Sequence, residues 1–393
     1  MRTLLITGPG GAGRTTIAAA TALTAAREGT RTLLLGTDPT DTLGAALGTP
    51  VTGPAPTPVA PDLTVWRPDP ATGFRAGLTA LQDRATTALD LLGAARLDPE
   101  ELTPLPGAAE LALLRALRDA ALADDAHELV VVDLPPSPGA LALLSLPGEL
   151  RRYLRRLLPP ERQAARALRP VLGRLAGVPM PAEALYEAAA RWDLELAATE
   201  AVVADHDTVV RLVAEPSPAG LDAVRATTLG LALHGLRTDV LVANRVFPEP
   251  TADTRLAGVV AQQRKAVDEW RESYDVRTVD HLGRDPRGTD DLAALAVPAV
   301  NTRQRTATVE WPVVDRIAED GVLVWHIPLP GAVREDLDLI RRGDELVVTA
   351  GQFRRIVPLP SGLRRCTVSG AGLRDGELRI RFAPDPGLWP AGR

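Results

Sequence analysis

Cysteine is almost absent from the chain, and its scarcity excludes several kinds of chemistry. The only cysteine among 393 residues is Cys366. A disulfide within one chain needs two cysteines, and so does any cysteine pair that binds a metal ion. A soft metal or metalloid that requires several thiolates therefore has no site within a single subunit.

Lysine is equally scarce, because Lys265 is the only one in an arginine-rich chain. The formal net charge is -6 at pH 7, and no basic stripe interrupts it, so we expect no nucleic-acid partner held by bulk charge.

The sequence has no apolar run of about twenty residues and no charged-then-apolar leader. We therefore expect a cytoplasmic protein without a transmembrane segment.

The length and the hydrophobic content leave room for more than one core. With 393 residues, 45% of them hydrophobic, the chain is expected to form one large domain and a smaller one. Apolar runs typical of buried parallel strands alternate with helical patterns, which predicts an α/β fold with a mostly parallel sheet. The proline-rich stretch 49–61 predicts a surface loop without regular structure.

The N-terminal stretch MRTLLITGPGGAGRTT predicts a strand, a phosphate loop and a helix in that order. Positions 8–15 fit the pattern G-x-x-x-x-G-K-[ST], except that Arg14 replaces the lysine. Glycines let backbone N–H groups turn toward phosphate oxygens, and the start of the helix adds its positive dipole end. A purely structural turn is the alternative. The predicted phosphate-binding residues are Gly8, Gly10, Gly11, Ala12, Gly13, Arg14, Thr15 and Thr16.

Two aspartates follow further apolar strands. Asp38 comes just after the run 31–36, and Asp133 ends the run that begins at position 128. The carboxyl ends of parallel strands form the edge where ligands bind in α/β folds. A strand that ends in aspartate downstream of a phosphate loop is a Walker B arrangement, so we expect Asp133 to hold Mg²⁺ through water and Thr15 to hold it by its hydroxyl. For Asp38, an Asp-Pro turn that caps the next helix is the alternative.

Together with a fourth segment, these motifs resemble one family. GPGGAGRTT, LLLGTDPTDTLG (33–44), VVVDLPPSPGALALLSLP (130–147) and the strand from Asp239 to Asn244 are similar to the arsenical pump-driving ATPase (ArsA) family, which includes the eukaryotic guided-entry targeting ATPases. The resemblance covers about residues 1–300 and implies a P-loop NTPase that binds ATP and Mg²⁺. It implies that Asp38 orients the attacking water and that Asn244 reads the adenine, for which an amide offers both donor and acceptor. A solvated strand end is the alternative for Asn244.

Both lysines of the family pattern G-K-G-G-x-G-K-T-T are replaced in this chain. Pro9 stands where the resemblance implies a lysine that reaches the partner's phosphates across a two-fold dimer, and proline offers neither charge nor N–H. Arg14, to which we assign a catalytic role beside Asp38, keeps a cation but has a bulkier, planar head group. We therefore expect nucleotide binding with weak hydrolysis.

Residues 148–205 interrupt the alternation with helical patterns, and the family has a helical subdomain at this place. The targeting ATPases would line it with methionines, whose flexible thioethers accommodate varied apolar helices, but the only methionines here are Met1 and Met180. Tail-anchored membrane-protein cargo is therefore not expected. Arsenite is not expected either, because it needs thiolates and Cys366 stands alone.

After a polar stretch at 301–307, expected to be a linker, the hydrophobic period changes to two. Apolar residues at 378, 380 and 382 alternate with arginines, as they do along a half-buried strand. Residues 308–383 resemble an α-crystallin (small heat-shock) domain, which implies a small all-β sandwich, and 384–393 form a tail.

The sequence therefore predicts an ArsA-like ATP-binding protein, an ATPase that acts as a nucleotide-driven switch on a protein client or partner. We expect either a homodimer or a heterodimer with a sister ATPase subunit. Two alternatives stay open. One is a non-hydrolysing nucleotide-binding scaffold, such as the pseudo-ATPase half of a heterodimer, and the other is an ATPase that works in positioning at a membrane surface.

Overall fold

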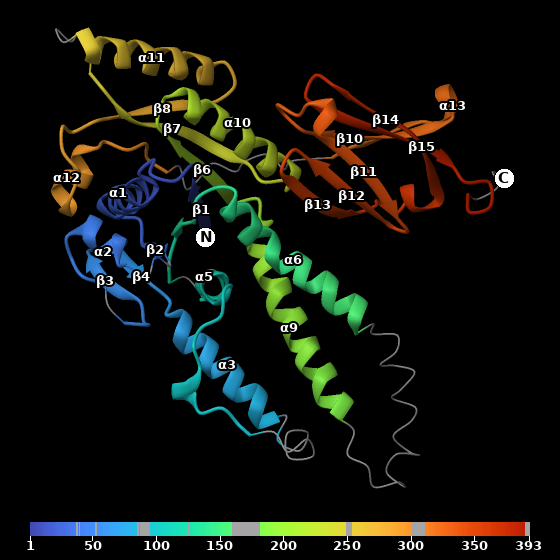
Figure 1. The fold of residues 1–393 in the computed structure, drawn as a ribbon, viewed down its shortest axis with the longest axis horizontal. Helices are drawn as coiled ribbons and strands as arrows, with labels where there is room; N and C mark the ends of the chain where they lie inside the picture. The colour runs from blue at the N-terminus through green and yellow to red at the C-terminus, as the bar shows by residue number, and fades with distance from the viewer. Residues whose placement is uncertain are drawn as a thin grey trace.

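A computed structural model of the chain describes residues 1–36, 38, 40–51, 53–84, 86, 95–123, 126–158, 181–248, 254–300 and 311–389. A helix-covered sheet lies beside an antiparallel sandwich (Figure 1). The expected linker at 301–307, the middle of the expected helical subdomain and the end of the expected tail lie outside the described residues.

The large sheet has the strand order β3-β4-β2-β5-β1-β6-β7-β8, and neighbouring strands are parallel except β3 with β4. Because β1 lies between β5 and β6, the loop that follows β1 opens in the middle of the carboxyl edge, where ligands bind in such sheets. The strands are β1 (Arg2–Thr7), β2 (Thr32–Gly36), β3 (Thr57–Ala60), β4 (Leu63–Trp66), β5 (Leu129–Asp133), β6 (Thr208–Ala214), β7 (Thr238–Val246) and β8 (Val276–Asp280).

Helices cover both faces of this sheet. One face carries α1 (Arg14–Arg27), α2 (Thr42–Leu47) and α12 (Gly288–Ala294), which pack on one another. The other face carries α5 (Ala108–Leu122), α6 (Gly139–Leu157), α9 (Pro181–Val203), α10 (Pro218–Leu233) and α11 (Thr254–Arg271). α3 (Pro70–Arg84) and the short turn η1 (Pro99–Glu101) complete this part, and α3 packs on α5. α6 and α9 run side by side away from the sheet (Figure 1).

Alternate residues of each central strand enter two different cores. Leu5, Val130 and Val132 belong to one buried cluster, whereas Leu4 and Val131 belong to the other. Successive side chains of a strand point to opposite faces, so a strand buried on both sides needs a continuous apolar run. The unbroken apolar runs of β1 and β5 are therefore explained by burial on both faces.

The C-terminal part is a sandwich of two antiparallel sheets, with the strand orders β14-β15-β10-β9 and β11-β12-β13. Leu378, Ile380 and Phe382 are all buried, as their alternation with arginines predicts. The elements are β9 (Val313–Arg316), α13 (Ile317–Asp320), β10 (Val322–Pro328), η2 (Arg334–Asp336), β11 (Leu337–Arg342), β12 (Glu345–Ala350), β13 (Phe353–Pro358), η3 (Leu363–Arg365), β14 (Cys366–Arg374) and β15 (Glu377–Pro384). The predicted fold class, a mostly parallel α/β sheet followed by a small β-sandwich, is confirmed.

The sandwich packs directly on the helical layer, because α10 contacts β10, β12 and β13. Gly230 of α10 lies where Leu141 and Phe353 meet, and a β-carbon at this position would lie 2.3 Å from the Leu141 side chain and 3.0 Å from the Phe353 ring. Buried residues of the α/β part and of the sandwich form one continuous hydrophobic cluster. The two parts therefore share a core.

The prediction of a structureless loop over 49–61 was wrong for its last residues. Thr57–Ala60 form β3, which pairs antiparallel with β4. β3 lies at the edge of the sheet, and an edge strand tolerates proline because one side of its backbone needs no hydrogen bonds. Pro58 is therefore compatible with a strand at this place. In addition, the helical stretch expected from 148 begins earlier, because α6 starts at Gly139.

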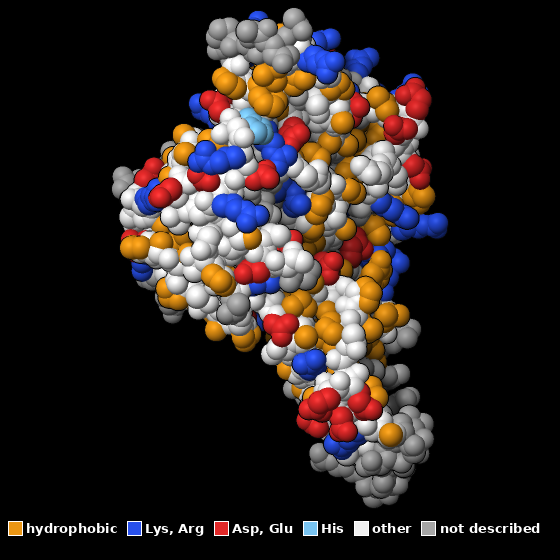
Figure 2. All heavy atoms as spheres, turned by 60° about the vertical axis from the view of Figure 1, so that its left-hand side comes forward, with side chains coloured by type: hydrophobic (Ala, Val, Ile, Leu, Met, Phe, Trp, Pro, Cys, Tyr) orange, Lys and Arg blue, Asp and Glu red, His pale blue; other side chains and the backbone are white. Residues whose placement is uncertain are grey.

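Charges of both signs are interspersed on the face that Figure 2 shows, where arginines lie beside aspartates and glutamates. Many ion pairs among the described residues are of this exposed kind, such as Arg31 with Glu128 at 3.4 Å. Such exposed pairs contribute little to stability, typically about 0–1 kcal/mol.

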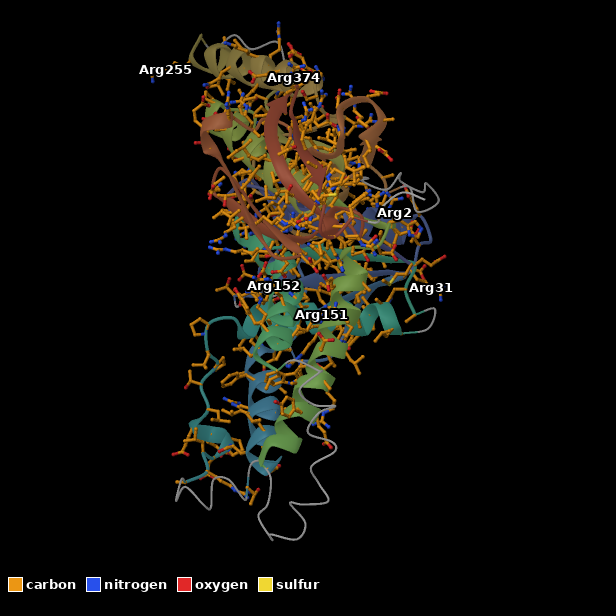
Figure 3. The ribbon with its side chains drawn as sticks, turned by 90° about the vertical axis from the view of Figure 1, so that its right-hand side faces the viewer. Arg2, Arg31, Arg151, Arg152, Arg255 and Arg374 are labelled. Carbon is orange, nitrogen blue, oxygen red and sulfur yellow. The ribbon has the colours of Figure 1, made fainter. Side chains whose placement is uncertain are left out.

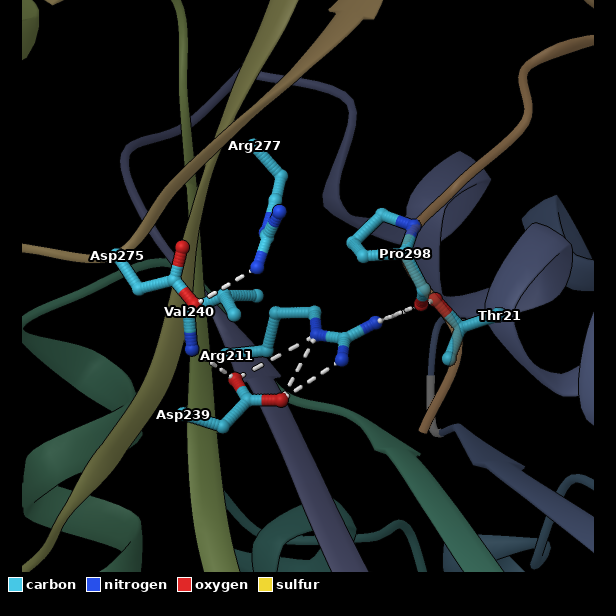
Figure 4. Close-up of polar contacts among 7 residues, drawn as sticks. All are labelled: Thr21, Arg211, Asp239, Val240, Asp275, Arg277 and Pro298. Carbon is cyan, nitrogen blue, oxygen red and sulfur yellow. Dashed lines mark hydrogen bonds and ion pairs between the residues drawn. The ribbon is translucent and has the colours of Figure 1, made fainter. Parts of the chain in front are cut away.

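One ion pair of a different kind is buried between the sheet and α1. The Arg211 side chain on β6 is only 1% exposed and donates to Asp239 on β7 at 2.7 Å. Its Nη1 donates to the carbonyl oxygen of Pro298 at 2.8 Å and lies 3.5 Å from the Thr21 hydroxyl on α1 (Figure 4). This guanidinium therefore ties two strands, a helix and the segment after α12 together.

We expect Asp239→Ala to lower the free energy of unfolding by about 3–5 kcal/mol, because it leaves the Arg211 charge buried without its partner. Urea denaturation followed by circular dichroism measures the change. The matched control is Asp275→Ala, which removes the neighbouring pair with Arg277, whose side chains are 57% and 52% exposed. The control should cost less than about 1 kcal/mol. Equal losses for the two variants would contradict this account.

Candidate functional site

The glycine loop after β1 is shaped by two close approaches. A β-carbon at Gly8 would lie 1.9 Å from the Val213 carbonyl oxygen, and one at Gly13 would lie 2.4 Å from the Asn244 amide nitrogen. Gly13 also has φ +85°, in the region that only glycine adopts without strain. These two positions therefore require glycine for the packing of the loop against β6 and β7.

The remaining glycines face open space. A β-carbon at Gly10 or Gly11 would meet no atom within 4 Å, so these two glycines are not needed to fit the loop against its neighbours. α1 begins directly behind the loop at Arg14, and its first N–H groups have no partner within the helix. The loop therefore offers free backbone and room on its outer side, which is what a bound phosphate group requires.

Thr15 and Asp133 meet at the start of α1. The Thr15 hydroxyl donates to Asp133 Oδ2 at 2.7 Å. Asp133 is only 8% exposed, and its second oxygen, Oδ1, is buried without a hydrogen-bond partner in the described part of the chain. Burial raises the pKa of Asp133 to about 6, against the lowering effects of the Thr15 hydrogen bond and the Arg14 charge. The Thr15 hydroxyl and the unused oxygen of the buried Asp133 carboxylate are suitable for holding Mg²⁺ through water.

Arg14 lies against the strand end that carries Asp133. Its Nη1 donates to the carbonyl oxygen of Leu134, the residue after Asp133, while its Nε is buried with no acceptor in the described segments. Burial lowers the pKa of Arg14, and the charges of Asp133 and Asp38 act in the opposite direction. In this arrangement one end of the guanidinium contacts the protein backbone.

Asp38 lies just beyond β2, in a turn that is tied by arginine. Asp38 Oδ1 accepts from the Thr40 amide at 2.8 Å, and Arg67 donates to the Asp38 carbonyl oxygen at 3.0 Å. Burial acts to raise the pKa of Asp38, but the hydrogen bonds from Thr40 and the charge of Arg67 lower it on balance. The carboxylate is therefore held in its charged form. Arg67 also pairs with Asp41 at 3.0 Å.

Asn244 at the end of β7 contacts the glycine loop. Its Nδ2 donates to the Ala12 carbonyl oxygen at 2.8 Å, and the residue is 5% exposed. The next residue, Arg245, donates to the Gly11 carbonyl oxygen at 3.2 Å and pairs with Glu215. The amide that the sequence assigns to adenine recognition thus holds the loop in the present structure, and its role toward adenine stays a prediction.

The sequence did not point to several residues that hold the site together. Arg245 and Arg67 were not predicted as site residues. Arg245 has a positive φ of 58°, but the sequence does not reveal this backbone conformation. The segment after β5 is also tied to the glycine loop, because the Ser137 amide donates to the Gly8 carbonyl oxygen at 3.1 Å and the Thr7 hydroxyl donates to that of Pro135 at 3.0 Å.

The predicted site residues converge on one edge of the sheet. The loop 8–16 follows β1, Asp38 follows β2, Asp133 ends β5 and Asn244 lies near the end of β7. All four strands run parallel. A glycine loop that joins the central parallel strand to a helix, with a carboxylate from the next strand at the helix start, defines a P-loop-like α/β protein.

A family model described as "Anion-transporting ATPase" (ArsA) matches residues 1–296, and a second model, an HSP20-like domain found in ArsA, matches 320–382. The chain belongs to the ArsA ATPase family and has a C-terminal HSP20-like domain. The resemblance to an ArsA-type ATPase with an α-crystallin-like domain is confirmed, and membership of an ATPase family supports an ATPase-like function.

Relatives of this chain match it over nearly its whole length. An uncharacterized protein of Streptomyces coelicolor is 78% identical over 100% of both chains. A protein of Mycobacterium tuberculosis is 32% identical over 99% of this chain and 97% of its own. A putative arsenical pump-driving ATPase of Aquifex aeolicus is 26% identical over 97% of this chain and 99% of its own. Among the described residues, no helix is long and apolar enough to cross a membrane.

Asp133→Asn should stabilise the ligand-free protein at neutral pH. The pKa of Asp133 is raised from 3.8 to about 6, so between these values the folded protein binds more protons than the unfolded chain, and stability falls as the pH rises. A shift of about two pKa units corresponds to about 3 kcal/mol above pH 6. The side-chain oxygen of asparagine can still accept the hydrogen bond from the Thr15 hydroxyl, and asparagine carries no charge. The gain, measured by urea denaturation, should shrink as the pH falls from 7 toward 4.

The matched control is Asp38→Asn, for which the sign is reversed. The pKa of Asp38 is lowered in the folded protein, so its charged form stabilises the fold above the unfolded pKa. Asp38→Asn should therefore lower stability at pH 7 or leave it unchanged. If Asp133→Asn is less stable than the wild type at pH 7, the buried charge of Asp133 does not destabilise the folded protein.

Proposed function

We propose that the protein is an ATP-dependent switch that binds Mg-ATP at the loop 8–16 and acts on a protein client or partner. The observation that carries the proposal is the pair of Thr15 and Asp133, which places a buried, unused carboxylate oxygen beside a glycine loop with an open outer face. Membership of the ATPase family supports the same function.

Each residue has a role that its position supports. The backbone N–H groups from Gly10 to Thr16 would contact the phosphates, and Thr15 and Asp133 would hold Mg²⁺, the latter through water. Bound Mg²⁺ would neutralise charge on the phosphate oxygens. Asp38, whose lowered pKa keeps it charged, would orient the attacking water, and Asn244 would contact the adenine from the end of β7.

The position of Arg14 favours binding over fast hydrolysis. The Arg14 guanidinium donates a hydrogen bond to the Leu134 carbonyl oxygen. A planar head group held in this way cannot move freely between phosphates as an ammonium can. Pro9 adds no charge of its own. Phosphoryl transfer is catalysed mainly by positioning and by charge on the transferred group, so one misplaced cation costs on the order of 10²- to 10³-fold.

A conformational change in the segment after Asp133 would reach the sandwich through one helix. α6 begins at Gly139, directly after this segment, and its C-terminal half carries Arg152, which pairs with Glu345 of β12 at 3.2 Å. Leu141 of the same helix meets Phe353 of β13 at Gly230. Nucleotide-dependent movement of α6 would therefore shift the surface that the sandwich presents to a partner.

The proposal includes a cytoplasmic location and a dimer, either of this chain or with a sister ATPase that retains its lysines. A non-hydrolysing scaffold is the second candidate, favoured by Pro9 and by the engaged guanidinium of Arg14. Positioning at a membrane surface is a third candidate, which no described contact favours. Arsenite as a ligand is disfavoured, because the single cysteine, Cys366, is buried in the sandwich.

Calorimetry should detect Mg-ATP binding to the full-length protein, and Thr15→Ala should weaken it at least about tenfold, equal to 1.4 kcal/mol. The physical reason is the loss of the hydroxyl that contacts both Asp133 and Mg²⁺. The control is Thr367→Ala, which changes an exposed threonine of β14 far along the chain and should bind as the wild type does. Absence of heat with folded wild-type protein and millimolar Mg-ATP would overturn the proposal.

Restoring both lysines should raise ATP turnover. We expect the combined change Pro9→Lys and Arg14→Lys to increase the hydrolysis rate by about 10²-fold, because it returns two cations to the phosphates. Adding Asp38→Asn to this background should abolish the gain, since the attacking water loses its orientation. Phosphate release measures all three. A wild-type protein that already turns over at about 1–100 per second, with no benefit from the lysines, would show that Arg14 replaces the lysine fully.

A further inference from the structure

A cavity lies between the helical layer and the sandwich, away from the glycine loop. Its volume is about 650 Å³, and it is lined by the C-terminal half of α6, the end of α9, the turn after α10, and residues of β12 and β13. Cavities of roughly 300–1,000 Å³ are typical of small-molecule sites. None of the residues assigned to the phosphate site lines it.

The cavity is rich in arginine, and we call it the arginine cleft. Its charged lining consists of Arg151, Arg152, Arg155, Arg156, Arg355, Glu149, Glu200 and Glu345. Figure 3 places Arg151 and Arg152 on the helical layer next to the sandwich. With the nearby Asp193, which pairs with Arg151 at 3.1 Å and Arg155 at 3.5 Å, four carboxylates face five guanidinium groups. One cation is therefore in excess.

The ion pairs identify the excess cation as Arg355. Arg152 and Arg156 both pair with Glu345, at 3.2 and 3.3 Å, and Arg151 pairs with Glu200 as well as with Asp193. Arg355, in contrast, has no acidic side chain within ion-pair distance among the described residues.

Arg355 is nevertheless largely withdrawn from water. Its Nη1 donates to the Leu233 carbonyl oxygen at 2.7 Å, and its guanidinium lies 5.1 Å above the Trp311 ring. Burial lowers its pKa, and Glu200 and Glu149 oppose this only from a distance. An arginine has five N–H donors, so several remain for a ligand. A charge that is partly withdrawn from water and has no acidic partner is stabilised when an anion approaches it.

A second donor in the same wall has no acceptor. The indole Nε1 of Trp311 is buried without a hydrogen-bond partner in the described part of the chain, and Trp311 lines the cleft. His234, which also lines it, has its pKa lowered to about 4 by burial and by the Arg355 charge. It is therefore neutral at pH 7 and adds no further positive charge. The cleft thus holds a guanidinium without an acidic partner and an indole N–H without an acceptor, and both could donate to an anion.

We propose that the arginine cleft binds a small organic anion bearing carboxylate or phosphate groups, with Arg355 as its central contact. A planar guanidinium matches both kinds of group with two parallel hydrogen bonds. The cavity is larger than inorganic phosphate alone would fill, which favours an organic molecule. Its position in a hollow between two parts of the chain favours a small molecule over the broad acidic surface of a protein. Bound there, the anion would bridge α6 and the sandwich.

The test uses the full-length protein and three probes, namely citrate, glucose 6-phosphate and inorganic phosphate, each titrated calorimetrically with and without saturating Mg-ADP. Saturable binding of citrate or glucose 6-phosphate that persists with Mg-ADP is expected. Arg355→Gln should weaken it at least about tenfold. The control is Arg374→Gln, at the exposed end of β14 (Figure 3), which should bind as the wild type does. Because glutamine keeps a donor for the Leu233 carbonyl oxygen and removes a charge that has no acidic partner, its melting temperature should stay close to that of the wild type.

A second readout is independent of heat. The chain has five histidines, so selective labelling resolves the ring signals of His234, which should shift on addition of the bound probe while the others do not. Absence of both saturable binding and a His234 shift would overturn the proposal, and so would unchanged affinity in Arg355→Gln. Phosphate binding that Mg-ADP abolishes would locate the anion at the glycine loop instead. Binding of an oligoglutamate peptide where all three probes fail would assign the cleft to an acidic protein partner.

Discussion

The hydrogen bond between Thr15 and Asp133 joins the start of α1 to the end of β5, and the proposed Mg²⁺ position depends on that contact. It places the carboxylate directly behind the glycine loop, where Asp133 is only 8% exposed. The same burial that makes the charged form of Asp133 costly leaves its second oxygen without a partner. A protein optimised only for stability would carry an uncharged residue there, so the site resembles other functional sites in which stability is given up for chemistry.

The segment after Asp133 links this contact to the rest of the molecule. Its backbone is held on the glycine loop at Gly8, and α6 continues from it toward the sandwich. Since α6 contributes buried leucines and ion-paired arginines to the boundary with the sandwich, a change at the loop has a continuous packed path to the C-terminal part. Such a path is a physical route by which two arrangements of α6 would couple the loop to the sandwich.

The parts of the site that depend on local patterns could be predicted from the sequence. The glycine loop, the two aspartates and the β-sandwich follow from residue spacing, strand patterns and a family resemblance. The contacts that position them could not, because they join distant residues. Asn244 and Ala12 are 232 positions apart, and nothing near either residue indicates that a carbonyl of the loop accepts from that amide. The edge strand at Thr57–Ala60 was missed because its proline is compatible with a strand only at an edge, and edges are decided by the topology of the whole sheet.

The shared packing at Gly230 has a consequence for the solubility of a truncated chain. Truncating the sandwich would uncover Leu141, Leu229 and the face of α10, which are buried in the intact chain. A contiguous apolar surface of this kind promotes self-association. The α/β part made alone would therefore tend to aggregate. The two parts therefore depend on each other for solubility, and loss of the sandwich would expose this apolar face without touching the glycine loop.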